Sequence, residues 1–109
     1  MIRVRIKGSP DKIEGFMVWG HAGLAPGDGD IVCAGVSAVS TAALIGLAEL
    51  VPGSARYKIL PQGLMYCRLV DGIPKAGAQK AQAVLAAMAL GLEAMQARYG
   101  DRIDFAYRR

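Results

Sequence analysis

The chain has 109 residues, with 13 Lys and Arg against 9 Asp and Glu and a formal net charge of +4 at pH 7. This length allows one core and excludes a second catalytic domain or a large cofactor-binding fold, so residues 1–109 are expected to form a single domain. With 53% hydrophobic and 20% charged residues, the chain is too apolar to be disordered. The mild positive charge permits a nucleic-acid partner without requiring one.

The first half of the chain predicts a hairpin followed by a long helix. Residues 2–7 alternate apolar and basic side chains, which indicates a strand with one buried face. Turn-forming residues at 8–11 separate it from a second extended run over 13–20. A glycine-rich loop follows, and Asp30 is predicted to cap a helix that Pro52-Gly53 ends.

The second half predicts another hairpin, a second helix and a final strand. Extended runs at 55–60 and 64–70 flank a Pro-Gln-Gly turn. Residues rich in Ala, Leu, Met and Gln predict a helix from Lys75 to Tyr99, with Gly100 at the C′ position. Apolar alternation over 103–107 predicts the last strand. The order β-β-α-β-β-α-β favours an α+β fold, a mainly antiparallel sheet with two long helices packed on one face.

The segment from Ile31 to Val51 is long enough to span a bilayer and carries one charge, Glu49. Its many small residues and its lack of basic or aromatic anchors favour a buried helix of a soluble protein instead. No membrane association is therefore expected. A helix that is apolar nearly all round needs cover on more than its sheet side, which predicts a homodimer.

The two cysteines, Cys33 and Cys67, are too few for a disulfide scaffold. No secretory leader is recognisable, so a cytoplasmic location with both thiols reduced is expected. Cys67 lies mid-strand between Tyr66 and Arg68 and is predicted to be a structural thiol.

Cys33 is the candidate nucleophile. It is predicted in the first turn of the long helix, where free N–H groups and the helix dipole lower the pKa of a thiol. A nearby imidazole could take the thiol proton and later protonate a leaving amine. The only histidine, His21, precedes Cys33 by twelve residues, and the glycine-rich loop is long enough to bring the two together. The alternative interpretation is a small buried cysteine and an unrelated histidine at a strand end.

Two motifs resemble the ribosomal-processing cysteine protease (Prp) family: Gly20-His21-Ala22-Gly23, and Gly29-Asp30-Ile31-Val32-Cys33-Ala34-Gly35-Val36-Ser37-Ala38. In that family, a Gly-His-Ala element and an Asp-Ile-Val-Cys-Ala element carry the catalytic residues. The resemblance implies a cytosolic bacterial endopeptidase that removes the short N-terminal extension of large-subunit ribosomal protein twenty-seven. It also implies a homodimer that needs no metal or cofactor.

By this resemblance, Cys33 would be the nucleophile and His21 the general base and acid. Asp30 and Ser37 match further motif positions and are expected to support the site; Ser37 follows Cys33 by four residues and shares its helix face. Backbone N–H groups around Cys33 are candidates for stabilising the oxyanion. Four more motif residues are expected in the loop or substrate-binding part: Gly20, Ala22, Gly23 and Ala34.

Other functions remain open. The thiol could be structural in a non-catalytic ribosome-associated binding module, or could serve a hydrolase that acts on something other than a peptide. A zinc site is not favoured, because zinc ligands usually occur as closely spaced pairs and none are paired here. The candidate ligands would be His21, Asp28, Asp30 and Cys33.

The basic residues outside the first strand are scattered along the chain, and no RNA-binding aromatic signature accompanies them. Direct nucleic-acid binding is therefore not expected. The set considered is Lys75, Lys80, Arg98, Arg102, Arg108 and Arg109, with Tyr99 and Tyr107. Arg3, Arg5 and Lys7 are expected on a solvated outer face of the sheet, away from a peptide substrate.

Overall fold

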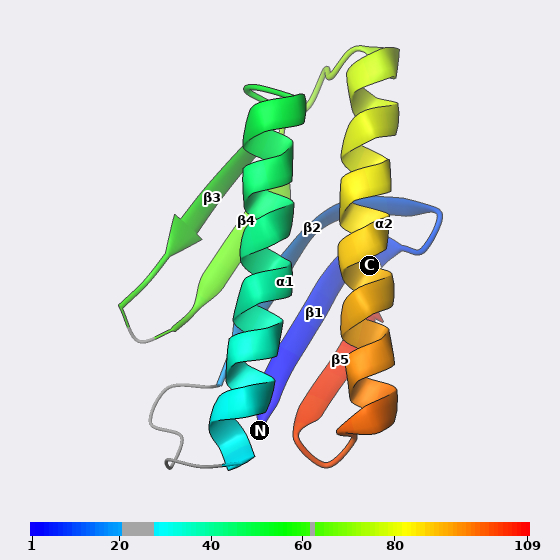
Figure 1. The fold of residues 1–109 in the computed structure, drawn as a ribbon. Coiled ribbons are helices and arrows are strands. Elements are labelled where there is room, and N and C mark those ends of the chain that lie inside the picture. The colour runs from blue at the N-terminus through cyan, green and yellow to red at the C-terminus, as the bar shows by residue number, and fades with distance from the viewer. Residues whose placement is uncertain (21–27, 62) are drawn as a thin grey trace.

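The computed structural model describes residues 1–20, 28–61 and 63–109, with the side chains of residues 28–30 not included. Its strands form one five-stranded sheet in the order β3-β4-β2-β1-β5. Two long helices lie side by side over this sheet (Figure 1). In chain order the elements are β1 (Ile2–Ser9), β2 (Lys12–Trp19), α1 (Asp28–Leu50), β3 (Ala55–Ile59), β4 (Met65–Leu69), α2 (Lys75–Arg98) and β5 (Ile103–Arg108).

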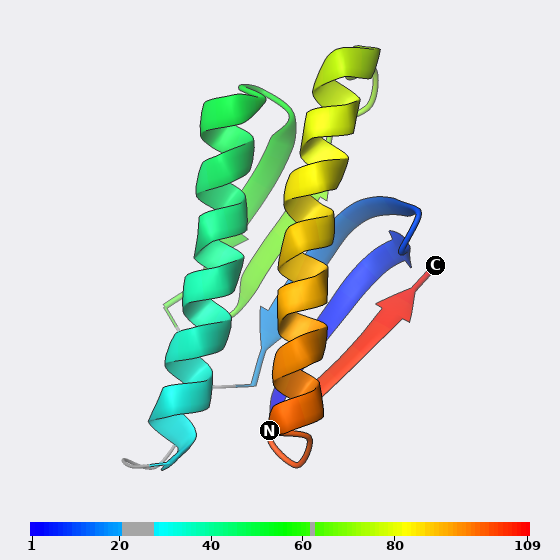
Figure 2. The same ribbon diagram turned by 45° about the vertical axis from the view of Figure 1, so that its right-hand side comes forward.

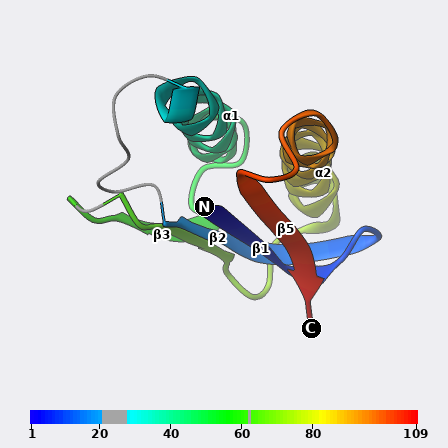
Figure 3. The same ribbon diagram turned by 90° about the horizontal axis from the view of Figure 1, so that it is seen from below.

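The sheet is mixed and mostly antiparallel. Antiparallel pairs join β1 to β2, β2 to β4 and β3 to β4, while β5 runs parallel to β1 at the opposite edge. Both helices cover the same face of the sheet, as the view from below shows (Figure 3). The α+β fold, the element order and the placement of the helices are therefore confirmed. Among the described residues, no element covers the other face.

The core lies between the sheet and the helix layer. Alternate residues of β1, namely Ile2, Val4 and Ile6, are at most 2% exposed. Leu85 and Leu92 of α2 are fully buried against this face. Burying each large aliphatic side chain contributes roughly 1.5–3 kcal/mol to the free energy of unfolding. Met88 of α2 is buried as well, so this side of the helix belongs to the core.

Glycines allow α1 and α2 to approach closely along their length (Figure 2). A Cβ added at Gly35 would lie 2.7 Å from Cε of Met95, and one at Gly46 would lie 3.2 Å from a methyl group of Val84. These glycines mark one flank of α1 as the flank that faces α2. The opposite flank of α1 faces away from the helix pair.

Two helix ends differ from expectation. The prediction that Asp30 caps the first helix is wrong, because α1 begins at Asp28 and Asp30 is its third residue. Acidic residues are favourable in the first helical turn, so an Asp there does not by itself mark a cap. At the end of α2, Tyr99 is the cap, and its N–H donates to the Met95 carbonyl at 2.8 Å. Gly100 follows as predicted, but without the positive φ typical of a helix-ending glycine.

Helix α1 is long and apolar enough to cross a membrane, judged by length and composition alone; its segment Ile31–Leu50 has a mean hydropathy of 2.1. A core helix of a soluble protein meets the same criterion. In this structure α1 packs on the sheet and on α2, and 33% of the apolar stretch within this segment is buried. Its outer side exposes Ile31, Ile45 and Leu50.

Candidate active site

Cys33 lies in the second turn of α1, as the sixth residue of the helix. Its side chain is half-buried, packs against the hydrophobic core and forms no disulfide. Ser37, also half-buried, follows one turn later on the same face of the helix, as predicted. Ala34 is exposed beside them. The thiol is thus held by packing on one side and remains partly accessible on the other.

The thiol lies on the flank of α1 that faces away from α2. Successive helix residues are about 100° apart, so Cys33 points away from the side of Gly35, which contacts α2. Leu44 lies on the same flank as Cys33, and it lines a hollow of about 230 Å³ with Tyr57 of β3. The β3–β4 hairpin lies on this side of α1 (Figure 1). The flank that carries the thiol therefore faces the β3 edge of the sheet.

The outermost strand on that side, β3, presents apolar surface. Tyr57 and Ile59 are paired with Cys67 and Met65, whose side chains are buried under the helices, so all four point to the helix side. Tyr57 is 55% and Ile59 56% exposed. An edge strand with exposed apolar side chains can receive an extended peptide. No motif marked these two residues, because their place on this side of α1 arises only from the sheet order.

The helix start changes the expected electrostatics of the thiol. The four N–H groups of α1 without an intrahelical partner are those of residues 28–31, one turn before Cys33. The dipole effect decreases within the first turn, and the N–H of a sixth helical residue donates to the carbonyl four residues earlier. The prediction of a first-turn thiol is therefore wrong, whereas the expectation that backbone N–H groups around Cys33 stabilise the oxyanion stays a prediction. Activation of this thiol needs a partner side chain.

Several predicted site residues lie outside the described part. His21, Ala22 and Gly23 belong to residues 21–27, and the side chain of Asp30 is not described. Gly20 is described: its φ is +92°, and an added Cβ would lie 2.5 Å from the Met1 carbonyl oxygen. Only glycine fits at this position.

Cys67, the second thiol, is 1% exposed on the helix side of β4. Burial raises its pKa from 9.0 to about 11, so it stays protonated at neutral pH. The prediction of a structural thiol agrees with this environment. Among the described side chains, no group of three or more His, Cys, Asp or Glu could hold a metal ion. The zinc alternative depended on His21, outside this range, and on two Asp side chains that are not described.

Comparison with known proteins identifies the family. A family profile described as "Cysteine protease Prp" matches residues 1–104. The ribosomal processing cysteine protease Prp of Bacillus subtilis is 32% identical over 105 residues, covering 94% of each chain.

Two crystal structures of the essential ribosomal processing protease Prp from S. aureus superpose on the chain at 27% identity. One, in complex with a substrate peptide, has a TM-score of 0.85, and the other, with a covalently linked product peptide, has a TM-score of 0.82. Each comparison covers 99% of this chain and all of the other.

The family profile and the curated relative place the chain among the cysteine proteases, which are hydrolases. The α+β fold and the accessible thiol on α1 suit this class. The chain belongs to the Prp family of ribosomal processing cysteine proteases.

Proposed function

We propose that the chain is a cysteine endopeptidase that removes the N-terminal extension of large-subunit ribosomal protein twenty-seven. Cys33 is the nucleophile, and His21 is the general base and acid. The observation that carries the proposal is the half-buried Cys33 on the flank of α1 that faces the free edge of β3. The family assignment supports the reaction class.

The reaction has two steps. His21 takes the thiol proton, the Cys33 sulfur attacks the scissile carbonyl carbon, and the C–N bond breaks as His21 protonates the departing amine. Water, deprotonated by His21, then attacks the thioester, and the acid product leaves with regeneration of the thiol. The covalently linked product peptide in the S. aureus relative supports a covalent route. The reaction requires no metal or cofactor. Asp30 and Ser37, which lie near Cys33 in the sequence of α1, support the Cys33–His21 pair.

The substrate binds in extended form beside β3. Main-chain groups at the free edge of β3 offer hydrogen bonds, and Tyr57 with Leu44 offers an apolar subsite. Gly20, Ala22, Gly23 and Ala34 contribute to substrate binding. The substrate peptide bound to the S. aureus relative supports peptide binding by this fold.

We further propose that residues 1–109 form a single protease domain and act as a cytoplasmic homodimer. Ile31 and Ile45 of α1 and Leu90 of α2 are each more than half exposed on the helix layer. Covering this apolar surface by a second copy would remove it from water. Light scattering should give twice the monomer mass; a monomer at micromolar concentration would contradict the dimer.

Mass spectrometry of a cleavage reaction tests the protease. The substrate is a synthetic peptide that spans the N-terminus of the host's own large-subunit ribosomal protein twenty-seven. We expect a single cut by the wild type, loss of cleavage by a factor on the order of 10⁴ or more in Cys33→Ala and in His21→Ala, and retained cleavage in Cys67→Ala. Cys67→Ala is the matched control, because it removes the other thiol.

Absence of a cut by folded wild-type protein would favour the alternative of a non-catalytic binding module. Alkylation separates the two further. A catalytic Cys33 should react with iodoacetamide below pH 8.5 faster than a free thiol does, and should lose this advantage in His21→Ala. A structural thiol would show no dependence on His21.

A further inference from the structure

The uncovered face of the sheet carries rows of side chains that are set by the strand register. Residues paired across neighbouring strands point to the same face. One row crosses all five strands and consists of four cations and a glycine: Arg56, Arg68, Gly15, Lys7 and Arg108. The row beside it consists of Lys58, Tyr66, Met17, Arg5 and Ala106. Trp19, Arg3 and Asp104 follow as a third, shorter row.

The charge of this face exceeds that of the whole chain. Seven cations of the three rows stand against one carboxylate, Asp104, whereas the chain as a whole has a net charge of +4. The remaining surface is therefore net negative. The Asp104 carboxylate accepts a hydrogen bond from the Arg5 guanidinium at 2.8 Å, and its Oδ2 lies 3.9 Å from Nε of Arg3. Within residues 1–20, 28–61 and 63–109, the other five cations have no carboxylate within 4.0 Å.

The arrangement is unfavourable for folding alone. Arg56 lies directly opposite Arg68, and Lys7 lies opposite Arg108. Like charges at directly paired positions destabilise a sheet. An anionic partner on this face would remove that repulsion. Binding such a partner therefore explains the presence of these cations, whereas packing within the fold does not.

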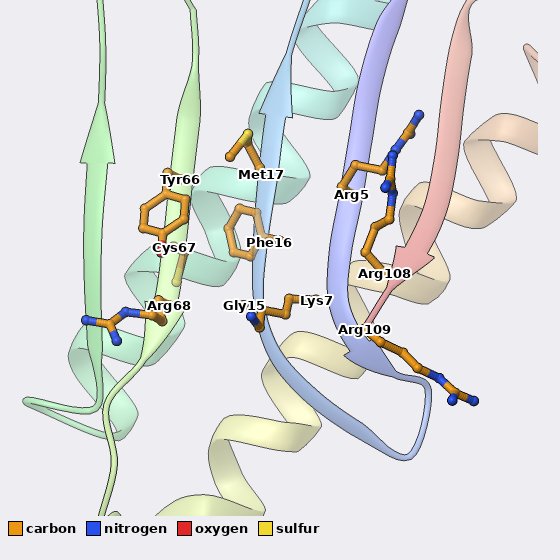
Figure 4. A pocket seen from close by; sticks show the side chains of 10 residues that line it. All are labelled: Arg5, Lys7, Gly15, Phe16, Met17, Tyr66, Cys67, Arg68, Arg108 and Arg109. Carbon is orange, nitrogen blue, oxygen red and sulfur yellow. The ribbon is translucent and has the colours of Figure 1, made fainter.

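An apolar hollow interrupts the first row of cations. Gly15 contributes no side chain between Arg68 and Lys7, and a hollow of about 160 Å³ opens there. Tyr66 and Met17 form its apolar wall, and basic side chains surround it (Figure 4). The residues around the rim are Arg5, Lys7, Arg68, Arg108 and Arg109. An apolar hollow with a basic rim fits a ligand that has a planar apolar group and a negative charge next to it.

We propose that this face binds single-stranded RNA. The cations contact successive phosphates, and a base enters the hollow and stacks on Tyr66. A flat sheet with an aromatic ring among basic side chains is a surface on which unpaired bases can stack, whereas a duplex offers only its phosphates to such a face. The choice of RNA over other polyanions rests on the proposed function in ribosomal protein processing.

The RNA face and the protease site lie on opposite sides of the sheet. Cys33 belongs to the helix layer, and the strand register places the cations of the three rows on the face that the helices leave uncovered (Figure 3). RNA can therefore hold the enzyme near a ribosomal substrate without blocking the thiol. The prediction that the chain does not bind nucleic acid was based mainly on cations of the second helix and the C-terminus. The cations of the strands were not part of that set as a group, because only the strand register brings them onto one face.

Fluorescence anisotropy with a labelled twelve-nucleotide single-stranded RNA tests the proposal between 50 and 200 mM salt. The variant Lys7→Gln/Arg68→Gln/Arg108→Gln should bind at least about tenfold more weakly, and its slope of log K against log salt should be shallower by about 2. The matched control Lys75→Gln/Lys80→Gln/Arg98→Gln removes the same charge from α2 and should bind like wild type. Circular dichroism melts verify that each variant folds.

A second pair of variants tests stacking. Tyr66→Leu should weaken RNA binding about fivefold or more, whereas Tyr57→Leu, on the helix side of the sheet, should leave it unchanged. Equal losses in both triple variants, no loss in the first, or equally tight binding of single-stranded DNA or phosphatidylglycerol vesicles would each overturn the proposal. Cleavage of the ribosomal peptide without RNA should be unchanged in the first triple variant. If the wild-type protein did not cleave the peptide, only the proposed function would be contradicted, and the RNA-binding measurements would still test the RNA proposal.

Discussion

The two faces of the sheet differ in what determines their residues. On β1, Ile6 is fully buried under the helices, whereas its neighbour Lys7 is exposed on the uncovered face. Positions on the helix side must fill space, so their side chains report the fold. Positions on the open face meet no packing demand from a covering element. Seven cations there indicate a partner more directly than any core residue indicates a function.

The largest expected difference between the faces is in stability. Ile6→Ala should lower the free energy of unfolding by about 2–5 kcal/mol, because it leaves a cavity in a packed core. Lys7→Ala, one residue further, should change it by less than about 0.5 kcal/mol or raise it slightly, since the repulsion from Arg108 is lost. Urea denaturation measures both. Similar losses in the two variants would show that the open face is packed as well, which would contradict its role as a free surface.

Gly15 is where the two faces constrain each other. A Cβ at this position would lie 2.3 Å from the Cys67 carbonyl oxygen, so Gly15→Ala must displace β4. We expect a loss of about 1–3 kcal/mol in urea denaturation.

The matched control for Gly15 is Gly91→Ala on α2. A Cβ at Gly91 would make only ordinary contact, at 3.6 Å from Val39. Alanine in the middle of a helix should stabilise the protein by up to about 1 kcal/mol. A harmless Gly15→Ala would show that the hollow does not depend on the close approach of β2 and β4.

Local patterns predicted the elements of this fold closely. Alternation in β1 and β5 and the turn residues between the strands were sufficient, because each signal acts over a few residues. The motif around Cys33 predicted the family for the same reason. The start of α1 was three residues off, since helix boundaries depend on weak local preferences. This small shift moved Cys33 out of the first turn and changed the electrostatic argument.

Features that arise from register could not be predicted in this way. Tyr57 and Leu44 lie thirteen residues apart and meet only because α1 packs beside β3. The cations of the open face come from four strands spread over the whole chain. The sequence predicted Arg3, Arg5 and Lys7 on one solvated face of the sheet, but without the strand order the cations of β3, β4 and β5 could not be placed beside them.

Cys67, the buried thiol on the helix side of the sheet, makes the free energy of unfolding depend on pH in the alkaline range. Cys67 has a pKa of about 11 in the folded protein against 9.0 ordinarily, so the folded state favours the protonated thiol. This contribution is complete below pH 9 and is lost as the pH rises toward 11. Between pH 8 and 10 the wild type should lose on the order of 1 kcal/mol more than Cys67→Ala does. Equal slopes in chemical denaturation would show that the thiol ionises freely.

The smallest expected effects concern Asp104, the one carboxylate of the three rows. A hydrogen bond from Arg5, with the nearby charges of Arg5, Arg3 and Arg108, lowers its pKa. Its stabilising contribution is therefore present above the usual Asp pKa and is lost as the pH falls through the lowered value. Asp104→Asn should flatten the acid side of the stability profile slightly. An unchanged profile would show that the contact with Arg5 is too exposed to affect folding.

The same substitution sharpens the comparison of the two faces. Asp104→Asn removes a negative charge beside Arg5 and should raise affinity for single-stranded RNA by a few fold, with a slightly steeper salt dependence. Peptide cleavage should not change, because Asp104 lies on the face away from Cys33. An added affinity that appears equally in Asp101→Asn, an exposed carboxylate in the turn before β5, would reflect net charge alone. A gain confined to Asp104 would mean that RNA contacts this sheet face.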